Sequence, residues 1–168
     1  MSSTLGKNLE ISIFGESHGD AIGVVISGLP SGEVVDKDII NRYLKKRATG
    51  KDKTMTARVE ADEVQFLSGV YNGYTTGTPL AMVIYNGDQR SKDYSNIATT
   101  ARPSHADYSG FVRYKGFNDI RGGGHFSGRL TTPMVMAGSL CYGILKNKGI
   151  DICANIFEIG SVKGERLG

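Results

Sequence analysis

Residues Phe14 to Gly28 read FGESHGDAIGVVISG, in which a polar turn separates two apolar segments. The segments ISIF and AIGVVIS predict two neighbouring strands, and Gly15-Glu16-Ser17-His18-Gly19 joins them. A plain turn needs only glycine, asparagine or aspartate, because these residues tolerate the required backbone angles. A carboxylate, a hydroxyl and an imidazole between two glycines therefore indicate a turn that carries chemistry.

The composition is that of one globular domain with a real core. The chain has 168 residues, of which 39% are hydrophobic and 22% charged, with a net charge of only +3. This balance does not indicate a nucleic-acid or membrane-surface protein. The 23 glycines are roughly twice the usual share of about 7% and indicate backbone that closely approaches a ligand.

The expected cellular location is inferred from the absence of targeting and membrane-spanning segments in this sequence. The opening MSSTLGKNLE is not a signal peptide, and no apolar run is long enough to span a bilayer, so we expect a cytoplasmic protein. Cys141 and Cys153 form no CxxC pair and no metal-ligand spacing. We expect both to be buried thiols in a reducing compartment.

The remaining elements are predicted from periodicity and caps. Asp36 can cap a helix over 37–47, and a second helix is expected from an N-cap at Thr132, with Pro133 at its first position, to a closing Gly149. Further strands are predicted over 63–70, 78–86, 111–117 and 150–160. The stretch 87–110 is long and irregular, which is uncommon unless such a segment is functional.

The three histidines, His18, His105 and His125, all lie in loops that carry glycine, serine or arginine. Imidazole is the side chain best suited to proton transfer near neutral pH, although a structural loop histidine remains the alternative for each. A metal site is disfavoured, because no pair has HExxH spacing and no cysteine cluster joins them. A triad of Ser104, His105 and Asp107 is also disfavoured, since there is no GxSxG turn.

Cationic residues accompany these loops. They are Arg47, Lys53, Arg58, Arg102, Arg121 and Arg129. A solvated basic face is the alternative, but the arginine fork binds phosphate or carboxylate in a bidentate way. The segment RGGGHFSGR before the second helix offers N–H groups to an anion, although it is neither a Walker A loop nor GxGxxG. A small phosphorylated, carboxylated substrate fits better than nucleic acid, because few aromatic residues interleave with the cations.

Several blocks of this sequence resemble chorismate synthase. FGESHG is similar to the first signature of that family, and RGGGHFSGRLTTPMVMAGSL to the second. TTGTPLAMVIYNGDQRSKDYS and RPSHADY resemble blocks between them. The likeness covers the whole chain in order. It implies a lyase of the shikimate pathway for aromatic amino acid biosynthesis, which eliminates phosphate from 5-enolpyruvylshikimate 3-phosphate in a trans-1,4 sense and requires reduced FMN without net redox change.

The resemblance also implies roles for single residues. His18 matches the family's proton donor to the reduced flavin, and His105 matches the histidine that assists the departing phosphate. The substrate contacts map onto Arg47, Lys53, Arg102 and Arg129, and the flavin contacts onto His125, Phe126 and Ser127. Lys53 stands where the family has arginine, and His-Phe-Ser where it has Arg-Ser-Ser. Ser104 and Leu130 replace a glycine and a glutamate.

The family is roughly twice as long as this chain, and its third signature, an Arg-Ser-Asp with a catalytic aspartate, is absent. Residues 1–168 therefore match the N-terminal portion of a single catalytic domain, expected to be weak or inactive alone. The implied fold is α+β: a β-α-β sandwich, incomplete here, in which helices lie between antiparallel sheets. The implied assembly is a homotetramer.

Two rival functions are open at this point: a non-catalytic half-enzyme that binds an anion, and a flavin-dependent oxidoreductase. A lyase needs reduced flavin only catalytically, whereas an oxidoreductase would consume NAD(P)H in step with product. The sequence contains no nicotinamide fingerprint. An external flavin reductase is therefore expected, rather than reduction by the protein itself with NADPH.

Overall fold

The computed structural model describes residues 3–48, 62–87 and 100–166, and within them the main feature is one antiparallel sheet. Its five strands run in the order β1-β2-β3-β7-β4. Their bounds are Thr4–Leu5 for β1, Glu10–Gly15 for β2, Ala21–Ser27 for β3, Gln65–Ser68 for β4 and Leu80–Tyr85 for β7. Two short pairs complete the strands: β5 (Val70–Tyr71) with β6 (Tyr74–Thr75), and β8 (Glu158–Ile159) with β9 (Val162–Lys163).

The two strands predicted at the opening of the chain form a hairpin. β2 pairs with β3 in a register that sets Ile13 opposite Val24 and Gly15 opposite Ile22. The turn Glu16–Asp20 therefore lies at one end of the sheet. β7 pairs with the other side of β3, with Ala21 opposite Tyr85, so that the residue after β7 reaches the same end.

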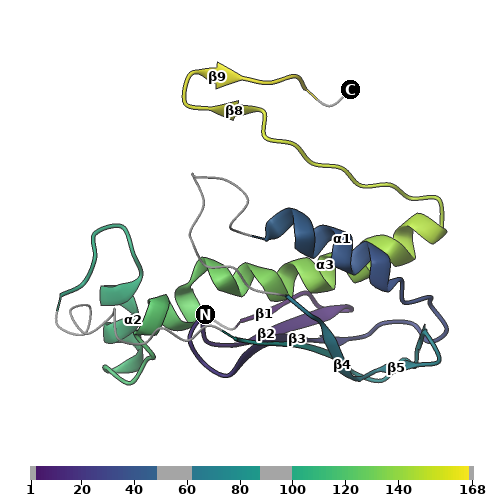
Figure 1. Ribbon diagram of the computed structural model, residues 1–168, viewed down its shortest axis with the longest axis horizontal. Helices are drawn as coiled ribbons and strands as arrows, with labels where there is room; N and C mark the ends of the chain where they lie inside the picture. Colours follow the sequence, from purple (N-terminus) through teal and green to yellow (C-terminus); the bar gives the residue numbers. More distant parts are fainter. Residues whose placement is uncertain (1–2, 49–61, 88–99, 167–168) are drawn as a thin grey trace.

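Two helices cover one face of this sheet (Figure 1). α1 (Lys37–Arg47) begins as predicted, because the Asp36 carboxylate accepts hydrogen bonds from the backbone N–H groups of Asp38 and Ile39. α3 (Thr131–Asn147) packs beside it. The buried side chains that form the core come from alternate strand positions and from one side of each helix: Ile22, Val24, Ile26, Leu80, Met82, Ile84, Ile40, Leu44, Met136, Ala137, Leu140 and Ile144. This confirms the mixed α and β class with an antiparallel sheet.

One predicted strand is a helix. Residues Asp107–Tyr114 form α2, although FVRYKGF was expected to be extended. The helix ends because Lys115 and Gly116 both have positive φ, at 54° and 80°. The alternation of apolar and polar residues over so short a run fits either structure, so the prediction from period alone was wrong.

The start of the second predicted helix was also misplaced. Two 3-10 segments, η2 (Arg121–Phe126) and η3 (Gly128–Leu130), run directly into α3, which begins at Thr131. The Ser127 hydroxyl accepts from the backbone N–H of Arg129 and so caps η3, whereas α3 has no side-chain cap. Pro133 sits at the third helical position, where its missing N–H leaves no intrahelical bond unmade.

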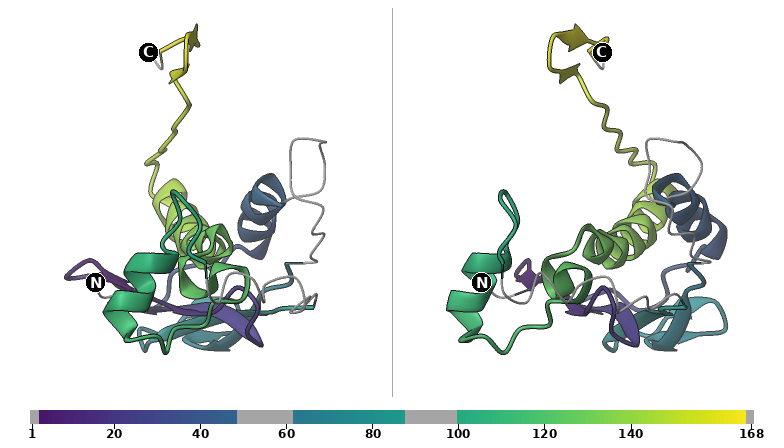
Figure 2. Two further views of the ribbon diagram at one scale, coloured as in Figure 1. Left: turned by 90° about the vertical axis from the view of Figure 1, so that its left-hand side faces the viewer. Right: turned by 60° about the vertical axis from the view of Figure 1, so that its left-hand side comes forward.

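The predicted strand over 150–160 is wrong over most of its length. Residues 150–157 are extended but unpaired, and they lead to the β8–β9 hairpin, which stands away from the body in both further views (Figure 2). A strand pattern forms a ladder only beside another strand, and the described residues offer none there. Cys153 is exposed and Cys141 half-buried, both as free thiols, so the expectation of two buried thiols was wrong. No helix among the described residues could cross a membrane.

Candidate functional site

The turn between β2 and β3 is buried at its centre. Ser17 is 2% exposed and His18 is 5% exposed, which is unusual for a polar hairpin turn. The Gly19 N–H donates to the Glu16 carbonyl, and the Ser17 N–H donates to the Gly124 carbonyl. The second bond joins the turn to the glycine-rich segment more than a hundred positions later in the chain.

That glycine-rich segment lies against the His18 ring. Gly122, Gly123 and Gly124 all have positive φ, between 54° and 84°. A Cβ on Gly122 would overlap the Nδ1 and Cε1 atoms of His18, and a Cβ on Gly124 would overlap the Asp119 carbonyl. The glycines are therefore required both for their backbone angles and for close approach to His18.

Arg102 lies near the same segment. Its Nη2 is 3.7 Å from the place a Gly123 Cβ would occupy. Asp107, in the first turn of α2, accepts from the Arg102 backbone N–H, Nε and Nη2 at 2.8–2.9 Å. These hydrogen bonds lower the pKa of Asp107 to about 2. The pair holds the guanidinium near Gly123, so Arg102 and His18 both lie near one loop.

Two further predicted cations share one carboxylate. Arg129 Nη1 donates to Asp62 Oδ1 at 2.6 Å, and Arg47 Nη1 donates to Asp62 Oδ2 at 3.2 Å. The Arg129 and Asp62 side chains are each only 6% exposed. Asp62 therefore brings the guanidinium groups of Arg47 and Arg129 together, and such groups are well suited to bind phosphate or carboxylate.

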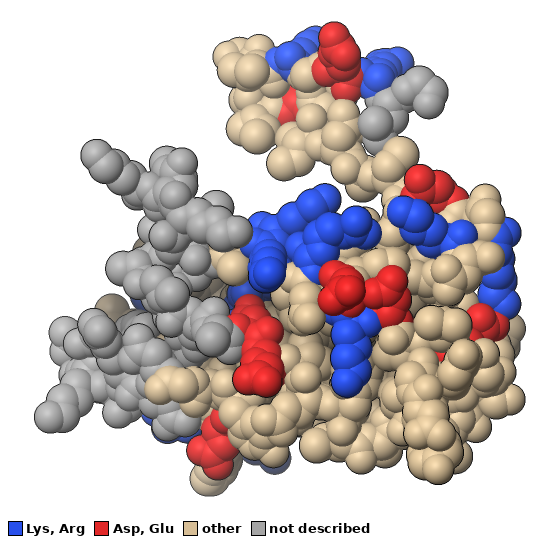
Figure 3. Space-filling model, turned by 45° about the vertical axis from the view of Figure 1, so that its right-hand side comes forward, with Lys and Arg blue, Asp and Glu red and all other residues tan. Residues whose placement is uncertain are grey.

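Arg129, which is buried, and Arg47, which is half-buried, differ from the exposed cations. Figure 3 shows lysine and arginine side chains gathered on one side of the body, with acidic side chains directly beside them. Exposed pairs of that kind contribute little to stability or binding, because water and salt screen them. Arg129 therefore stands out from the basic face by its burial, and Arg47 by sharing the Asp62 carboxylate with it.

His105 lies apart from His18 in the described contacts. It is exposed, and its Nδ1 atom is 3.0 Å from the Pro103 carbonyl oxygen. Its neighbour Ser104 has a φ of 63°, which places the loop in the left-handed region. Lys53, the remaining predicted substrate contact, lies outside the described residues, as does Arg58.

Glu16 and the pair Asp119–Arg121 add charge beside the turn. Burial raises the pKa of Glu16, and its Oε2 atom is buried without a hydrogen-bond partner among the described residues. Arg121 donates from Nε and Nη2 to the Asp119 carboxylate and lowers the pKa of Asp119. The Glu16 backbone carbonyl, by contrast, accepts from the Gly19 N–H within the turn and from Asn86 Nδ2 after β7.

The three residues predicted to contact the flavin have partners in the protein. His125 Nδ1 donates to the Gly15 carbonyl at 2.8 Å, and its Nε2 is 2.6 Å from the Ser3 hydroxyl. The Phe126 ring packs 6.1 Å from the Tyr114 ring, and the Ser127 hydroxyl caps η3. His125 lines two cavities of about 280 and 260 Å³, one shared with Phe126 and the other with Ser127. Ligand sites usually measure about 300–1,000 Å³, so these residues fit one wall of a flavin site rather than a whole one.

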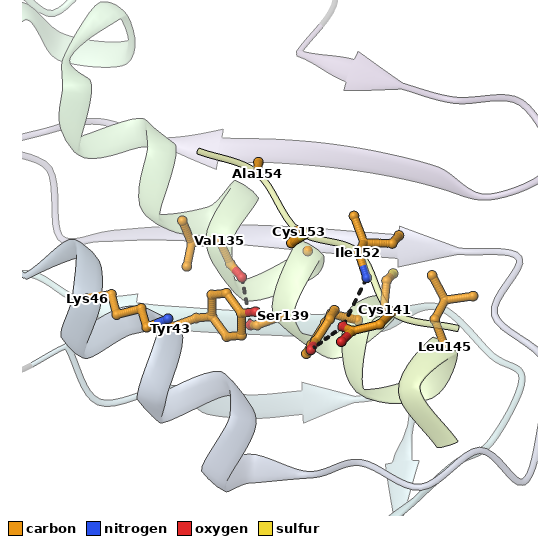
Figure 4. A pocket seen from close by; sticks show the side chains of 12 residues that line it. Tyr43, Lys46, Val135, Ser139, Cys141, Leu145, Ile152, Cys153 and Ala154 are labelled. Carbon is orange, nitrogen blue, oxygen red and sulfur yellow. Dashed lines mark hydrogen bonds between the residues drawn. The ribbon is translucent and has the colours of Figure 1, made fainter. Parts of the chain in front are cut away.

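A wider cavity of about 580 Å³ lies elsewhere, between α1, α3 and residues 151–154 (Figure 4). Tyr43, Val135 and Cys141 are among its lining residues, and Tyr142 donates to Asp151 at 2.7 Å beside it. That bond raises the pKa of Tyr142 to about 12. None of the predicted site residues lines this cavity, so its size does not make it the candidate site.

The sequence did not single out Asp62 or Asn86. Asn86, 9% exposed, follows β7 directly, and its Oδ1 accepts from Arg129 Nη2 at 3.3 Å. The available signals were weak: an aspartate in the acidic run before β4, and an asparagine at the end of an apolar strand. Neither residue carries a motif, and only the folded chain brings both to Arg129.

Comparisons with known proteins agree on one family. A sequence model of the family described as Chorismate synthase matches residues 9–167. The chorismate synthase of a Nitratiruptor species is 47% identical over 165 residues, which are 98% of this chain and 46% of that protein. The chorismate synthase of Thermococcus kodakarensis is 48% identical over 158 residues, 94% of this chain and 44% of that protein.

A solved structure agrees with the sequence relatives. A crystal structure of chorismate synthase matches with a TM-score of 0.62 at 28% identity, over 86% of this chain and 36% of that chain. The present chain spans less than half the length of the curated relatives it matches.

Proposed function

Because the chain belongs to the chorismate synthase family, we propose that the complete protein eliminates phosphate from 5-enolpyruvylshikimate 3-phosphate to give chorismate. One observation supports an anionic substrate above the others. Arg47 and Arg129 meet at Asp62, and Arg129 also contacts Asn86 beside the turn that carries His18. Arginine forks at a dry place bind phosphate and carboxylate groups with two parallel hydrogen bonds.

The residues divide between binding and proton transfer. Arg47, Arg129, Arg102 and Lys53 bind the substrate anion and stabilise charge on the departing phosphate. The Nδ1–Cε1 edge of His18 lies against Gly122, so we assign the transferred proton of His18 to Nε2. His105, on its exposed loop, is proposed to donate a proton to the leaving phosphate, which is a poor leaving group until it is protonated or paired with cations.

Reduced FMN is the proposed cofactor, and when bound it supplies transient electron density as the phosphate leaves. His125, Phe126 and Ser127 would form one wall of its site. The source of the reduced flavin, whether an external reductase or NADPH, stays a prediction, as do the homotetramer and the cytoplasmic location.

We further propose that residues 1–168 are the N-terminal portion of one catalytic domain and are inactive alone. The support is length: the relatives are about twice as long as the region they share with this chain. The group that removes the ring proton and most of the flavin cavity would then come from the remainder of the complete protein.

The test replaces Arg129 by alanine in the complete protein and measures binding of phosphorylated substrate and of FMN by calorimetry. Losing hydrogen bonds to a charged group costs roughly 1.5–3 kcal/mol, so substrate affinity should fall roughly 10- to 100-fold, while FMN affinity changes less. Arg47→Ala should act in the same direction. Arg42→Ala is the matched control, because Arg42 is exposed on the same helix.

Two outcomes would contradict the assignment. FMN binding that weakens more than substrate binding would remove Arg129 from the substrate site. A complete protein that releases no phosphate in a single turnover with reduced FMN would contradict the lyase activity itself.

A further inference from the structure

Asn86 holds the turn of His18 to the end of β7. Its backbone N–H donates to the Asp20 carbonyl at 2.9 Å. Its side-chain Nδ2 lies within hydrogen-bond distance of three carbonyl oxygens of the turn: Gly19 at 2.8 Å, Glu16 at 3.2 Å and Ser17 at 3.4 Å. One buried amide therefore contacts backbone carbonyl oxygens on both sides of His18.

The other end of the same amide faces the arginines. Asn86 Oδ1 accepts from Arg129 Nη2 at 3.3 Å, and Arg129 Nη1 donates to Asp62. The amide cannot be turned around, because Nδ2 would then face the guanidinium and Oδ1 would face the carbonyl oxygens. A continuous line of hydrogen bonds thus runs from Asp62 through Arg129 and Asn86 to the turn.

An anion bound to the arginines would alter this line of hydrogen bonds. Asp62 and Asn86 each accept one N–H group of Arg129, from Nη1 and from Nη2, so an anion that draws the planar guanidinium towards itself changes the geometry of both hydrogen bonds at once. The His18 ring lies directly against the Gly122 backbone, so a shift of the turn changes the contact between them. Both ends of the line are buried, which limits its screening by water.

We propose that Asn86 is a positioning residue that transmits occupancy of the Arg47–Arg129 anion site to the turn that carries His18. The proposal rests on the proposed function only in taking an anion as the ligand of these arginines. Couplings between sites in proteins commonly lie between roughly 5- and 150-fold in affinity, and the three carbonyl contacts allow an effect in that range. Removing the amide should uncouple the two sites without emptying the anion site.

The test uses inorganic phosphate as the probe and the ring signal of His18 in the complete protein as the reporter. Histidine rings are isotope-labelled, and the His18 signal is identified by its loss in His18→Gln. At constant pH, phosphate should shift this signal in the wild type. In Asn86→Ala, phosphate should still bind, within about fivefold of wild type, but the His18 signal should no longer respond.

Asn118→Ala is the matched control, because Asn118 is another partly buried asparagine of this region but is not part of the line. In this control the His18 signal should respond to phosphate as in the wild type. If Asn86→Ala does not fold, Arg129→Lys serves as the second variant: one ammonium group keeps the charge but cannot bridge Asp62 and Asn86 as the fork does. It should also bind phosphate without moving the His18 signal.

Two results would overturn the proposal. A His18 signal that still responds in Asn86→Ala would mean that phosphate acts on the ring directly. Phosphate binding lost altogether in Asn86→Ala would make Asn86 part of the anion site. Turnover separates this proposal from the function: in the complete protein Asn86→Ala should lower kcat more than it raises KM. If phosphate shifts the His18 signal in the wild type but the complete protein does not turn over 5-enolpyruvylshikimate 3-phosphate, only the proposed lyase activity is contradicted.

Discussion

At the scale of single residues, His18 is positioned mainly by backbone. Gly122 lies against one edge of its ring, the Ser17 N–H donates to Gly124, and Asn86 gathers the carbonyls around it. Backbone atoms have little freedom to relax around a buried ring. The His18 ring, our proposed proton donor, keeps this geometry only if the glycines remain glycines.

Gly122→Ala should therefore damage both stability and the site. The left-handed conformation costs a non-glycine residue roughly 1–2 kcal/mol, and the new methyl group would also displace the His18 ring. The free energy of unfolding, measured by denaturant titration, should fall by at least that amount, with activity of the complete protein largely lost. Gly128→Ala is the control, since φ there is not positive and a Cβ would meet open space. Equal losses in the two variants would contradict the special role of Gly122.

The residue types of the site were predictable, but their partners were not. The side-chain type alone indicates proton transfer for a histidine in a glycine turn, such as His18. It likewise indicates anion binding for an arginine beside glycines, such as Arg129. Asp62 and Asn86 are ordinary residues next to strands, and their importance arises from the pairing of β3 with β7 and the packing of α3 behind it. No local pattern in one sequence encodes such a distant contact.

At the scale of elements, the accuracy of prediction followed the number of independent signals. β3 and α1 have the bounds expected from the sequence, because β3 combines a long apolar run with a glycine-rich turn, and α1 combines an apolar face with a capping Asp36. α2 has no side-chain cap, and its short pattern predicted a strand instead. Residues 150–157 have strand alternation but no strand to pair with among the described residues.

The ion pair between Arg102 and Asp107 lies at the start of α2. Because Asp107 titrates, the contribution of this pair to the free energy of unfolding depends on pH. The pKa of Asp107 is lowered from 3.8 to about 2, so the pair stabilises the fold above pH 3.8 and loses that contribution as the pH falls towards 2. Asp107→Asn should lower the free energy of unfolding by about 1 kcal/mol at neutral pH, and the difference from wild type should disappear near pH 2. Urea titrations across this range measure it.

Asp38→Asn provides the comparison for that experiment, since Asp38 also lies in the first turn of a helix but is exposed. At neutral pH, the free energy of unfolding of Asp38→Asn should differ less from that of the wild type than the free energy of unfolding of Asp107→Asn does. If the free energy of unfolding of Asp107→Asn differs from that of the wild type by the same amount at neutral and at acid pH, the asparagine acts through packing rather than through charge.

At the scale of the whole molecule, the C-terminal segment carries apolar side chains into solvent. Ile152, Ile156, Ile159 and Val162 are between 58% and 72% exposed along the extended segment and its hairpin. Exposed apolar residues and unpaired strand edges favour association between copies of a chain. The 168-residue chain on its own should therefore self-associate as its concentration rises.

Replacing Ile156 and Ile159 together by lysine should reduce that association, as measured by sedimentation at increasing concentration. The same charge added at two exposed polar positions, Ser31→Lys with Asn41→Lys, is the control. If both double variants reduce association equally, repulsion between net charges explains the effect and the apolar segment does not.

The contact between Ser3 and His125 sets an order of events during synthesis. The two residues are 122 positions apart, and the Ser3 carbonyl also accepts from the Ile13 N–H beside β1. Ribosomes add about 5–20 residues per second, so the first segment of the chain waits roughly 6–24 s for its histidine partner. The residues of the β2–β3 hairpin are synthesised long before then, so the turn of His18 is without the Gly122–Gly124 segment until about a hundred further residues have been added.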